Sequence, residues 1–245
     1  MKITIERFDP AADPAPYSKT YEVPYTEHMT ILEALMYIYE NHEPIAFDYN
    51  CHGRDCGRCA MMYDGTPVLA CVEPITDGDH ELAPLAGHPV LRDLIVDKSK
   101  ATRNLAATYN RVRVTPLTRE DLDTFDMSAQ KHLDGIEWCC RCQNCTTQCP
   151  GVAANPEYVG PSRMVAIAYR HLDPYDQGDR ILEAVQGGLW SCIMCGQCDD
   201  VCNSPEIKHL ELWQILRDEA TKRGFTEDAI KGASEAAQSS QAQTA

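Results

Sequence analysis

The pattern of apolar and polar residues alternates at the start of the chain and then takes on a helical period. Residues 2–8 and 18–24 both read as β-strands, which would form a hairpin. Thr30 opens a predicted helix, because Glu33 follows it at the spacing of a capping box. The apolar stripe of this helix comprises Ile31, Leu35, Ile38 and Tyr39.

Further strands are predicted around a turn at Asp64-Gly65, after a cysteine-bearing loop at residues 49–59. Strand, strand, helix, cysteine loop and more strands is the order of a β-grasp ferredoxin domain. From residue 97 to residue 128 the chain is polar, which indicates a linker with short helices. Beyond it, helical patterns alternate with cysteine loops.

Two later helices have recognisable starts. Gly160-Pro161-Ser162 begins one. Ser204-Pro205-Glu206 has the cap-then-proline order of another, which would stop at Gly224. The predicted fold class is therefore α+β. It would comprise a plant-type ferredoxin domain at 1–100, a helical bacterial-type dicluster domain at 101–232 and a disordered tail at 233–245.

Charge and hydropathy limit the possible partners. The 245 residues carry a formal charge of −15, which argues against nucleic acid or anionic lipid as the direct partner. No stretch approaches about 18 consecutive apolar residues, so we expect no transmembrane helix. The N-terminus lacks the apolar run of a signal peptide. Any membrane attachment would come through a partner.

Thirteen cysteines are the dominant feature of the sequence. Without an export signal they are expected to be reduced thiols, which favours metal binding over disulfides. They fall in three groups, at 51–71, 139–149 and 192–202, and residues 72–138 contain none.

The first group has the C-x4-C-x2-C…C spacing of a plant-type [2Fe–2S] site. Its ligands would be Cys51, Cys56, Cys59 and Cys71. Gly53 and Gly57 would let the loop fold tightly, with backbone amides directed at the sulfurs. A structural zinc site is the alternative, but it normally uses paired C-x2-C arms. Charged residues of the loop are read as solvated, with tuning of the cluster or partner docking as the alternative. These residues are Arg54, Asp55 and Arg58.

The second and third groups both have the C-x2-C-x2-C-x3-C run of bacterial ferredoxins. In such proteins the fourth cysteine ligates the other cluster, which predicts two [4Fe–4S] sites with crossed ligands. One would use Cys139, Cys142, Cys145 and Cys202. The other would use Cys149, Cys192, Cys195 and Cys198. Cys140 is left over and is read as a small buried thiol. The histidines show no ligand spacing, although His52 lies inside the first loop.

A plant-type site followed by a bacterial-type pair resembles the iron–sulfur subunit of the fumarate reductase/succinate dehydrogenase family. The phrases closer to the fumarate reductase side are Tyr21-Glu22-Val23-Pro24-Tyr25, Cys56-Gly57-x-Cys59, residues 155–161 (NPEYVGP) and Trp190-Ser191-Cys192. The resemblance implies an FAD-bearing flavoprotein partner that interconverts fumarate and succinate, and a quinone-reactive membrane subunit. It places the [2Fe–2S] cluster nearest the flavin and the Cys149 cluster nearest the quinone.

Three departures from this family change the expectation. Most members of the family hold [3Fe–4S] at the third site, because they lack a cysteine at the position of Cys195. The four thiolates of this chain predict [4Fe–4S] instead, with [3Fe–4S] as the alternative. With this extra cysteine, the chain resembles the family members that are paired with a membrane anchor related to heterodisulfide reductase. Ala153, Ala154 and Ile193 stand where the succinate dehydrogenase branch has quinone-site residues. Asn203 follows Cys202 in place of the usual proline.

The leading hypothesis is an oxidoreductase subunit that relays electrons, with menaquinol as donor and fumarate chemistry on the flavoprotein. The chain itself would then carry no catalytic acid or base. Succinate oxidation would use the same parts in reverse. A component of a thiol-linked, heterodisulfide-reductase-like complex and a standalone multi-cluster ferredoxin are the alternatives. The expected location is the cytoplasmic side of the membrane, bound through partners, with export alongside a signal-bearing partner as the alternative.

Overall fold

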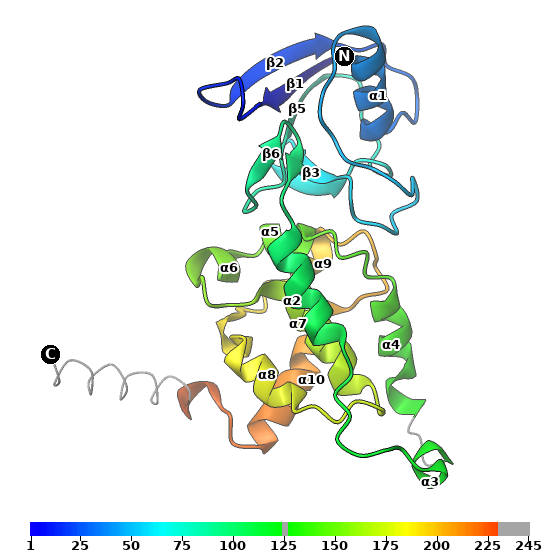
Figure 1. Ribbon diagram of the computed structural model, residues 1–245, viewed down its shortest axis with the longest axis vertical. Helices are drawn as coiled ribbons and strands as arrows, with labels where there is room; N and C mark the ends of the chain where they lie inside the picture. Colours follow the sequence, from blue (N-terminus) through cyan, green and yellow to red (C-terminus); the bar gives the residue numbers. More distant parts are fainter. Residues whose placement is uncertain (124–126, 230–245) are drawn as a thin grey trace, which may run out of the picture.

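The computed structural model describes residues 1–123 and 127–229. It has a sheet domain and a helical domain stacked along the long axis of the molecule (Figure 1). The predicted α+β class is confirmed. The predicted tail at 233–245 lies outside the described residues.

The sheet domain is built on a five-stranded mixed sheet with the strand order β2-β1-β5-β3-β4. Its strands are β1 (Lys2–Arg7), β2 (Tyr17–Glu22), β3 (Ala60–Tyr63), β4 (Thr66–Leu69) and β5 (Asp79–Ala83). Both predicted hairpins form, since β1 pairs antiparallel with β2 and β3 with β4. β5 was not predicted, and it joins the two hairpins by pairing parallel to β1. Ile3 and Ile5 alternate into the core, where both are fully buried.

Helix α1 (Ile31–Asn41) packs its apolar stripe into the same core. The predicted capping box is present: Glu33 N donates to Thr30 Oγ1 at 3.2 Å, and Thr30 N donates to Glu33 Oε2 at 2.7 Å. One member of the predicted stripe does not belong to it. Tyr39 is 53 % exposed and packs edge-to-face on Phe47, because it lies beyond the arc of the helix that faces the sheet.

A second, two-stranded sheet completes this domain. It comprises β6 (Val90–Arg92) and β7 (Ile95–Val96), with Asp93 in the turn. The buried Asp93 carboxylate accepts from Arg7 Nε at 2.8 Å, Ala46 N at 2.8 Å and Phe8 N at 3.1 Å. These bonds fix the hairpin to the end of β1, so the chain leaves the sheet domain at a defined point.

The helical domain is organised around α7 (Gly160–Leu172), which begins where predicted. The other helices are α2 (Ser99–Tyr109), α3 (Arg119–Asp123), η1 (Met127–Ala129), α4 (Gln130–Glu137), α5 (Asn144–Thr147), α6 (Pro150–Ala154), α8 (Arg180–Gln186), η2 (Leu189–Ser191), α9 (Gln197–Asp200) and α10 (His209–Lys222). The core between α7, α8 and α10 includes the fully buried Trp213. Among the described residues, no helix has both the length and the apolar character needed to cross a bilayer.

The interpretation of residues 97–128 as linker with short helices is only partly right. α2 runs for 11 residues in this stretch and packs against α7, with Leu105 buried. Its low overall hydropathy concealed this helix, since only one narrow face contacts the core. The segment is therefore part of the helical domain as well as the connection to it.

The predicted start of the last helix at Ser204-Pro205-Glu206 is wrong, because α10 begins at His209. Ser204 Oγ instead donates to the Trp138 carbonyl at 2.9 Å, and the following residues form a turn. The cap comes from outside the local sequence: Asp199 Oδ1 accepts from His209 N at 2.9 Å. The predicted end near Gly224 is consistent with α10, whose last residue is Lys222.

Candidate functional site

The first cysteine loop is wrapped around the sulfur of Cys51. The backbone amides of Gly53, Asp55 and Cys56 donate to Cys51 Sγ at 3.4, 3.3 and 3.4 Å. Positive φ angles at His52, Arg54 and Gly57 curl the chain so that these amides point inward. Amides directed at a thiolate lower the pKa of Cys51 and are typical of loops that hold iron–sulfur clusters.

Cys59 and Cys71 close the first group from the sheet side. Both are buried, Cys59 just before β3 and Cys71 just after β4. Burial is the main cause that raises the pKa of Cys59 to about 12, and the charge of the neighbouring Cys71 thiolate adds to the rise. Clustered buried thiols resist deprotonation unless a cation compensates their charge, so this donor set fits a metal group.

The second and third cysteine runs share one backbone conformation. In the second run Arg141 (φ +59°) and Gln143 (φ +80°) flank Cys142. In the third run Met194 (φ +57°) and Gly196 (φ +83°) flank the middle cysteine in the same way. Non-glycine residues at positive φ are uncommon, so three of them at matching places mark a repeated, strained loop.

The third cysteine of each run lies in a short helix, and the two helices touch. Cys145 is in α5 and Cys198 is in α9, and α5 contacts α9. The chain is thereby brought back so that the end of each run reaches the beginning of the other.

A cavity in the helical domain collects the predicted ligands of the second cluster. The cysteines that line it are Cys139, Cys140, Cys142, Cys145 and Cys202. Burial raises the pKa of Cys145 well above its ordinary value, and the neighbouring thiolates of Cys139 and Cys202 add to the effect. Both polar atoms of the buried Asn144 side chain lack a partner among the described residues. The four predicted ligand thiols converge here with Cys140 beside them, and together with the unpaired amide they fit a group whose sulfurs accept hydrogen bonds.

The predicted ligands of the third cluster also converge. Burial raises the pKa of Cys149, and the thiolates of Cys192 and Cys195 raise it further. The amide of Met194 donates to Cys192 Sγ at 3.4 Å. Cys195 is exposed, unlike the other cysteines, and Ile193 beside it is 69 % exposed. This group therefore opens toward the surface.

The first loop rests directly on the second run. A Cβ atom added to Gly57 would lie 2.4 Å from the Cys140 carbonyl oxygen and 2.9 Å from Cys142 Cα. Arg54 Nη1 donates to the Asn203 carbonyl at 2.7 Å, next to Cys202. The first and second cysteine groups are thus backbone neighbours.

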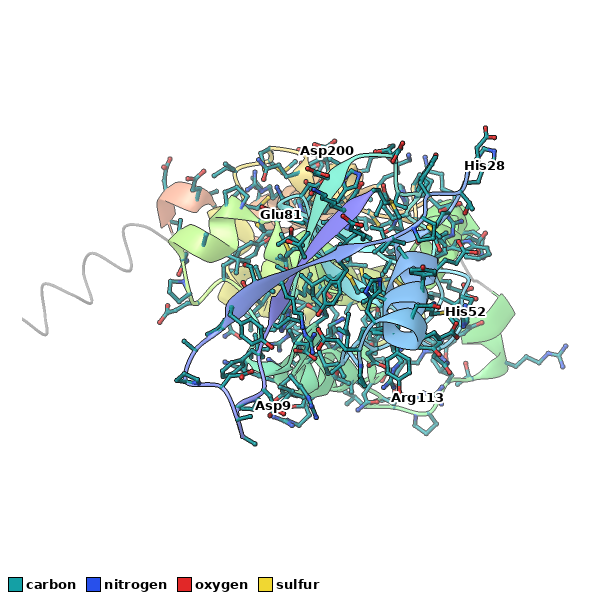
Figure 2. All side chains as sticks on the ribbon, turned by 90° about the horizontal axis from the view of Figure 1, so that it is seen from above. Asp9, His28, His52, Glu81, Arg113 and Asp200 are labelled. Carbon is teal, nitrogen blue, oxygen red and sulfur yellow. The ribbon has the colours of Figure 1, made fainter. Side chains whose placement is uncertain are left out.

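Other residues singled out from the sequence behave more simply. Arg58 pairs with Asp48, its Nε lying 2.9 Å from Asp48 Oδ1, and both Arg58 and Asp55 are exposed. His52 is exposed at the outer edge of the molecule beside α1 (Figure 2). Cys140 is half-buried, and its contact with the thiol of Cys142 lowers the pKa of Cys140 to about 7.

Sequence reasoning missed two residues at this site. His209 is buried, and its Nδ1 lies 2.8 Å from Asp199 Oδ1 beside Cys198. Lys98 donates from Nζ to the Gly57 carbonyl at 3.1 Å. Neither lies in a recognisable motif, because each reaches its partners only through the fold.

Two family models match the chain. The model described as a 2Fe-2S iron–sulfur cluster binding domain covers residues 2–103, and the model described as a 4Fe-4S dicluster domain covers residues 135–205. The fumarate reductase iron–sulfur subunit of Escherichia coli O6:H1 is 34 % identical over 211 residues, which cover 82 % of this chain and 86 % of that protein.

Other relatives widen the comparison. A fumarate reductase (CoM/CoB) subunit of Methanothermobacter marburgensis is 32 % identical, over 82 % of this chain but only 40 % of its own length. A chain of the Mycobacterium smegmatis Sdh1 complex in the apo form has the same fold, with a TM-score of 0.77 and 22 % identity over 92 % of this chain and 97 % of that one.

Proposed function

Because this chain belongs to the family of fumarate reductase iron–sulfur subunits, we propose that it is the electron-transfer subunit of a fumarate reductase or succinate dehydrogenase complex. One [2Fe–2S] and two [4Fe–4S] clusters would supply the one-electron steps. The residues of this chain hold and shield those clusters and set their order. Catalysis on the dicarboxylate belongs to a flavoprotein partner.

Twelve cysteines serve as ligands in this proposal. The [2Fe–2S] cluster is held by Cys51, Cys56, Cys59 and Cys71. The second cluster is held by Cys139, Cys142, Cys145 and Cys202, and the third by Cys149, Cys192, Cys195 and Cys198. The shared backbone conformation of the two runs supports full cysteine ligation at both, since Cys195 occupies the place of Cys142.

The close approach of Gly57 to Cys140 and Cys142 is the single observation that carries the relay. Electron transfer needs short gaps, and here the backbone that would enclose one cluster touches the backbone that would enclose the next. The contact between α5 and α9 continues the path from the second group to the third.

The partners follow from the two ends of this path. The first group would face an FAD-containing flavoprotein. The third group, which is exposed at Cys195, would face a quinone-reactive membrane subunit, with menaquinol as donor. The complex would be held at the cytoplasmic side of the membrane through that subunit. Ile193 beside Cys195 is 69 % exposed, so an apolar side chain is available there for such a contact.

The test is the metal content and spectrum of the complex, purified without oxygen. We expect about ten iron atoms per copy of this chain, two for the plant-type cluster and four for each of the others. Low-temperature paramagnetic resonance of the reduced complex should show all three centres, and fumarate should reoxidise them. Zinc in place of iron would refute the proposal.

Thiol-linked fumarate reduction is a second candidate, favoured by the similarity to the CoM/CoB-named relative and by the four cysteines of the third group. The purified complex would then reduce fumarate with thiols and not with menaquinol analogues. Comparing the two donors in one preparation decides between the candidates.

A further inference from the structure

Lys98 lies at the one place where the chain passes from the sheet domain to the helical domain. It stands between β7 and α2, at the junction that Figure 1 shows above α2. Its side chain is half-buried, and Nζ donates to the carbonyl of Gly57 at 3.1 Å. Gly57 is the residue of the first loop that touches the second cysteine run.

Lys98 lines a cavity between the two domains together with Cys56 of the first cysteine group and Cys139 of the second. Burial lowers the pKa of Lys98, and the neighbouring Cys142 of the second group and Cys59 of the first are the largest influences that oppose this lowering. The acidic residues of this cavity are Asp48, which is paired with Arg58, and Asp55 and Glu137. Within the described part of the chain, no ion pair joins Lys98 to a carboxylate. Lys98 therefore lies between the first and second cysteine groups.

A cation in this position has a predictable effect on a reducible centre. Cysteine-ligated clusters carry net negative charge, and reduction adds one more. A nearby positive charge stabilises the reduced form more than the oxidised form. The size of this stabilisation depends on the distance to the cluster and on the effective dielectric constant of the partly buried site. Because Lys98 adjoins ligands of both groups, it acts on both centres together.

We propose that Lys98 is the shared counter-cation of the first and second clusters and raises the reduction potentials of both. The inference rests on the iron–sulfur part of the proposed function. Lys98 takes no part in the transfer itself, in which one electron leaves one cluster and enters the next. Its effect on the clusters is electrostatic. Its hydrogen bond to the Gly57 carbonyl also fixes the distance between the first cysteine loop and the start of α2.

Three variants separate the charge of Lys98 from its hydrogen bond. Lys98→Met removes both, Lys98→Gln keeps a donor for the Gly57 carbonyl without the charge, and Lys98→Arg keeps the charge. Lys100→Met is the matched control, because it removes the same charge from an exposed position of α2 two residues away. The measurement is an anaerobic redox titration of the purified complex, followed cluster by cluster by low-temperature paramagnetic resonance.

The expected result is a fall of about tenfold in the equilibrium constant for reducing the second cluster in both Lys98→Met and Lys98→Gln. For a one-electron couple that is about 59 mV. The first cluster should shift in the same direction. Lys98→Arg, Lys100→Met and the third cluster in every variant should stay near the wild-type values.

Several results would overturn the inference. These are unchanged potentials in Lys98→Gln, a shift in Lys98→Met that Lys98→Gln does not reproduce, or an equal shift at the third cluster. Spin quantitation shows whether each variant holds its clusters; if Lys98→Met does not, Lys98→Gln and Lys98→Arg still decide the question. A wild-type complex without iron would instead refute the proposed function.

Discussion

Arg54 Nη1 donates to the backbone carbonyl of Asn203 at 2.7 Å, joining two loops that are 149 residues apart in sequence. Arg54 lies between two ligands of the first predicted cluster, and Asn203 follows a ligand of the second. The same guanidinium approaches Glu206 Oε1 at 3.6 Å. An arginine that could have been a solvated surface charge therefore connects the two cysteine loops.

Gly57 gives the sharpest test of the contact between the first cysteine loop and the second cysteine run. Gly57→Ala should destabilise the complex more than Gly65→Ala, although both residues have positive φ, +65° and +79°. The strain of a side chain at positive φ, about 1 kcal/mol, is common to both variants. Only at Gly57 would the new Cβ also meet backbone, at 2.4 Å from Cys140 O, whereas nothing lies within 4 Å at Gly65. Thermal loss of visible absorbance, which reports intact clusters, measures the difference; equal losses would contradict the contact.

The crossed ligation predicts that replacing the last cysteine of either run damages the cluster that the other run mainly holds. Cys202→Ser should damage the second cluster, because Cys202 lines the same cavity as Cys139 and Cys145. Cys149→Ser should damage the third cluster, because Cys149 interacts with Cys192. Paramagnetic resonance of each variant in the reduced complex tells the two centres apart. Loss confined to the third cluster in Cys202→Ser would show that each run serves its own cluster.

The shared shape of the cysteine loops could be anticipated because ligand spacing is local in the sequence, whereas the ligand role of each cysteine stays a prediction. The C-x2-C-x2-C spacing is typical of loops that hold a cluster, and the two runs with this spacing do share one backbone conformation. The capping box at Thr30 and the Asp64-Gly65 turn are local in the same sense. Each depends on residues within three or four positions of one another.

The missed features depend on distant partners. β5 reads DHELA, with no strand alternation, and it forms because β1 and β3 lie on either side of it. Lys98 contacts Gly57 across 41 residues, and no local pattern marks either as a neighbour of the other. The start of α10 was misplaced for the same reason, since its cap is Asp199 and not Ser204.

The buried pair of Arg7 and Asp93 should dominate the acid stability of the sheet domain. Burial alone would raise the pKa of Asp93, but the hydrogen bonds from Arg7, Ala46 N and Phe8 N outweigh it and lower the pKa below its ordinary value. A depressed carboxyl pKa stabilises the fold at pH values above the unfolded pKa of about 3.9, and the stabilisation is lost as the pH falls through the folded pKa.

Asp93→Asn should therefore cost about 3–5 kcal/mol at neutral pH, as for other buried pairs that lose one partner. The cost should hold from about pH 8 to pH 5 and shrink as the pH falls below the unfolded pKa of about 3.9 toward the lower folded pKa, where the wild-type carboxylate takes up a proton. Arg58→Met is the control, because it breaks an exposed pair worth at most about 1 kcal/mol. Urea unfolding followed by far-ultraviolet circular dichroism compares them; equal midpoints for the two variants would contradict the prediction.

Cys195 decides the type of the third cluster. Its loop repeats the backbone of the second run, with Met194 and Gly196 at positive φ on either side, which supports the proposal that its sulfur is a fourth ligand. Cys195→Ser should convert the third cluster toward [3Fe–4S], because an exposed serine is a poor ligand for iron and the other three cysteines remain. The [2Fe–2S] spectrum should not change.

Cys140→Ser is the matched control for that conversion. It removes the thirteenth cysteine, which the proposed ligand sets do not use, and the third cluster should keep its wild-type spectrum. The third cluster is the control readout, because Cys140 lines the cavity of the second cluster. The air-oxidised Cys195→Ser complex should show the paramagnetic [3Fe–4S] spectrum, and the wild-type complex should not. A wild-type complex that already shows this spectrum at full occupancy would mean that Cys195 does not bind iron, and the third centre would then have three cysteine ligands despite the fourth thiol beside it.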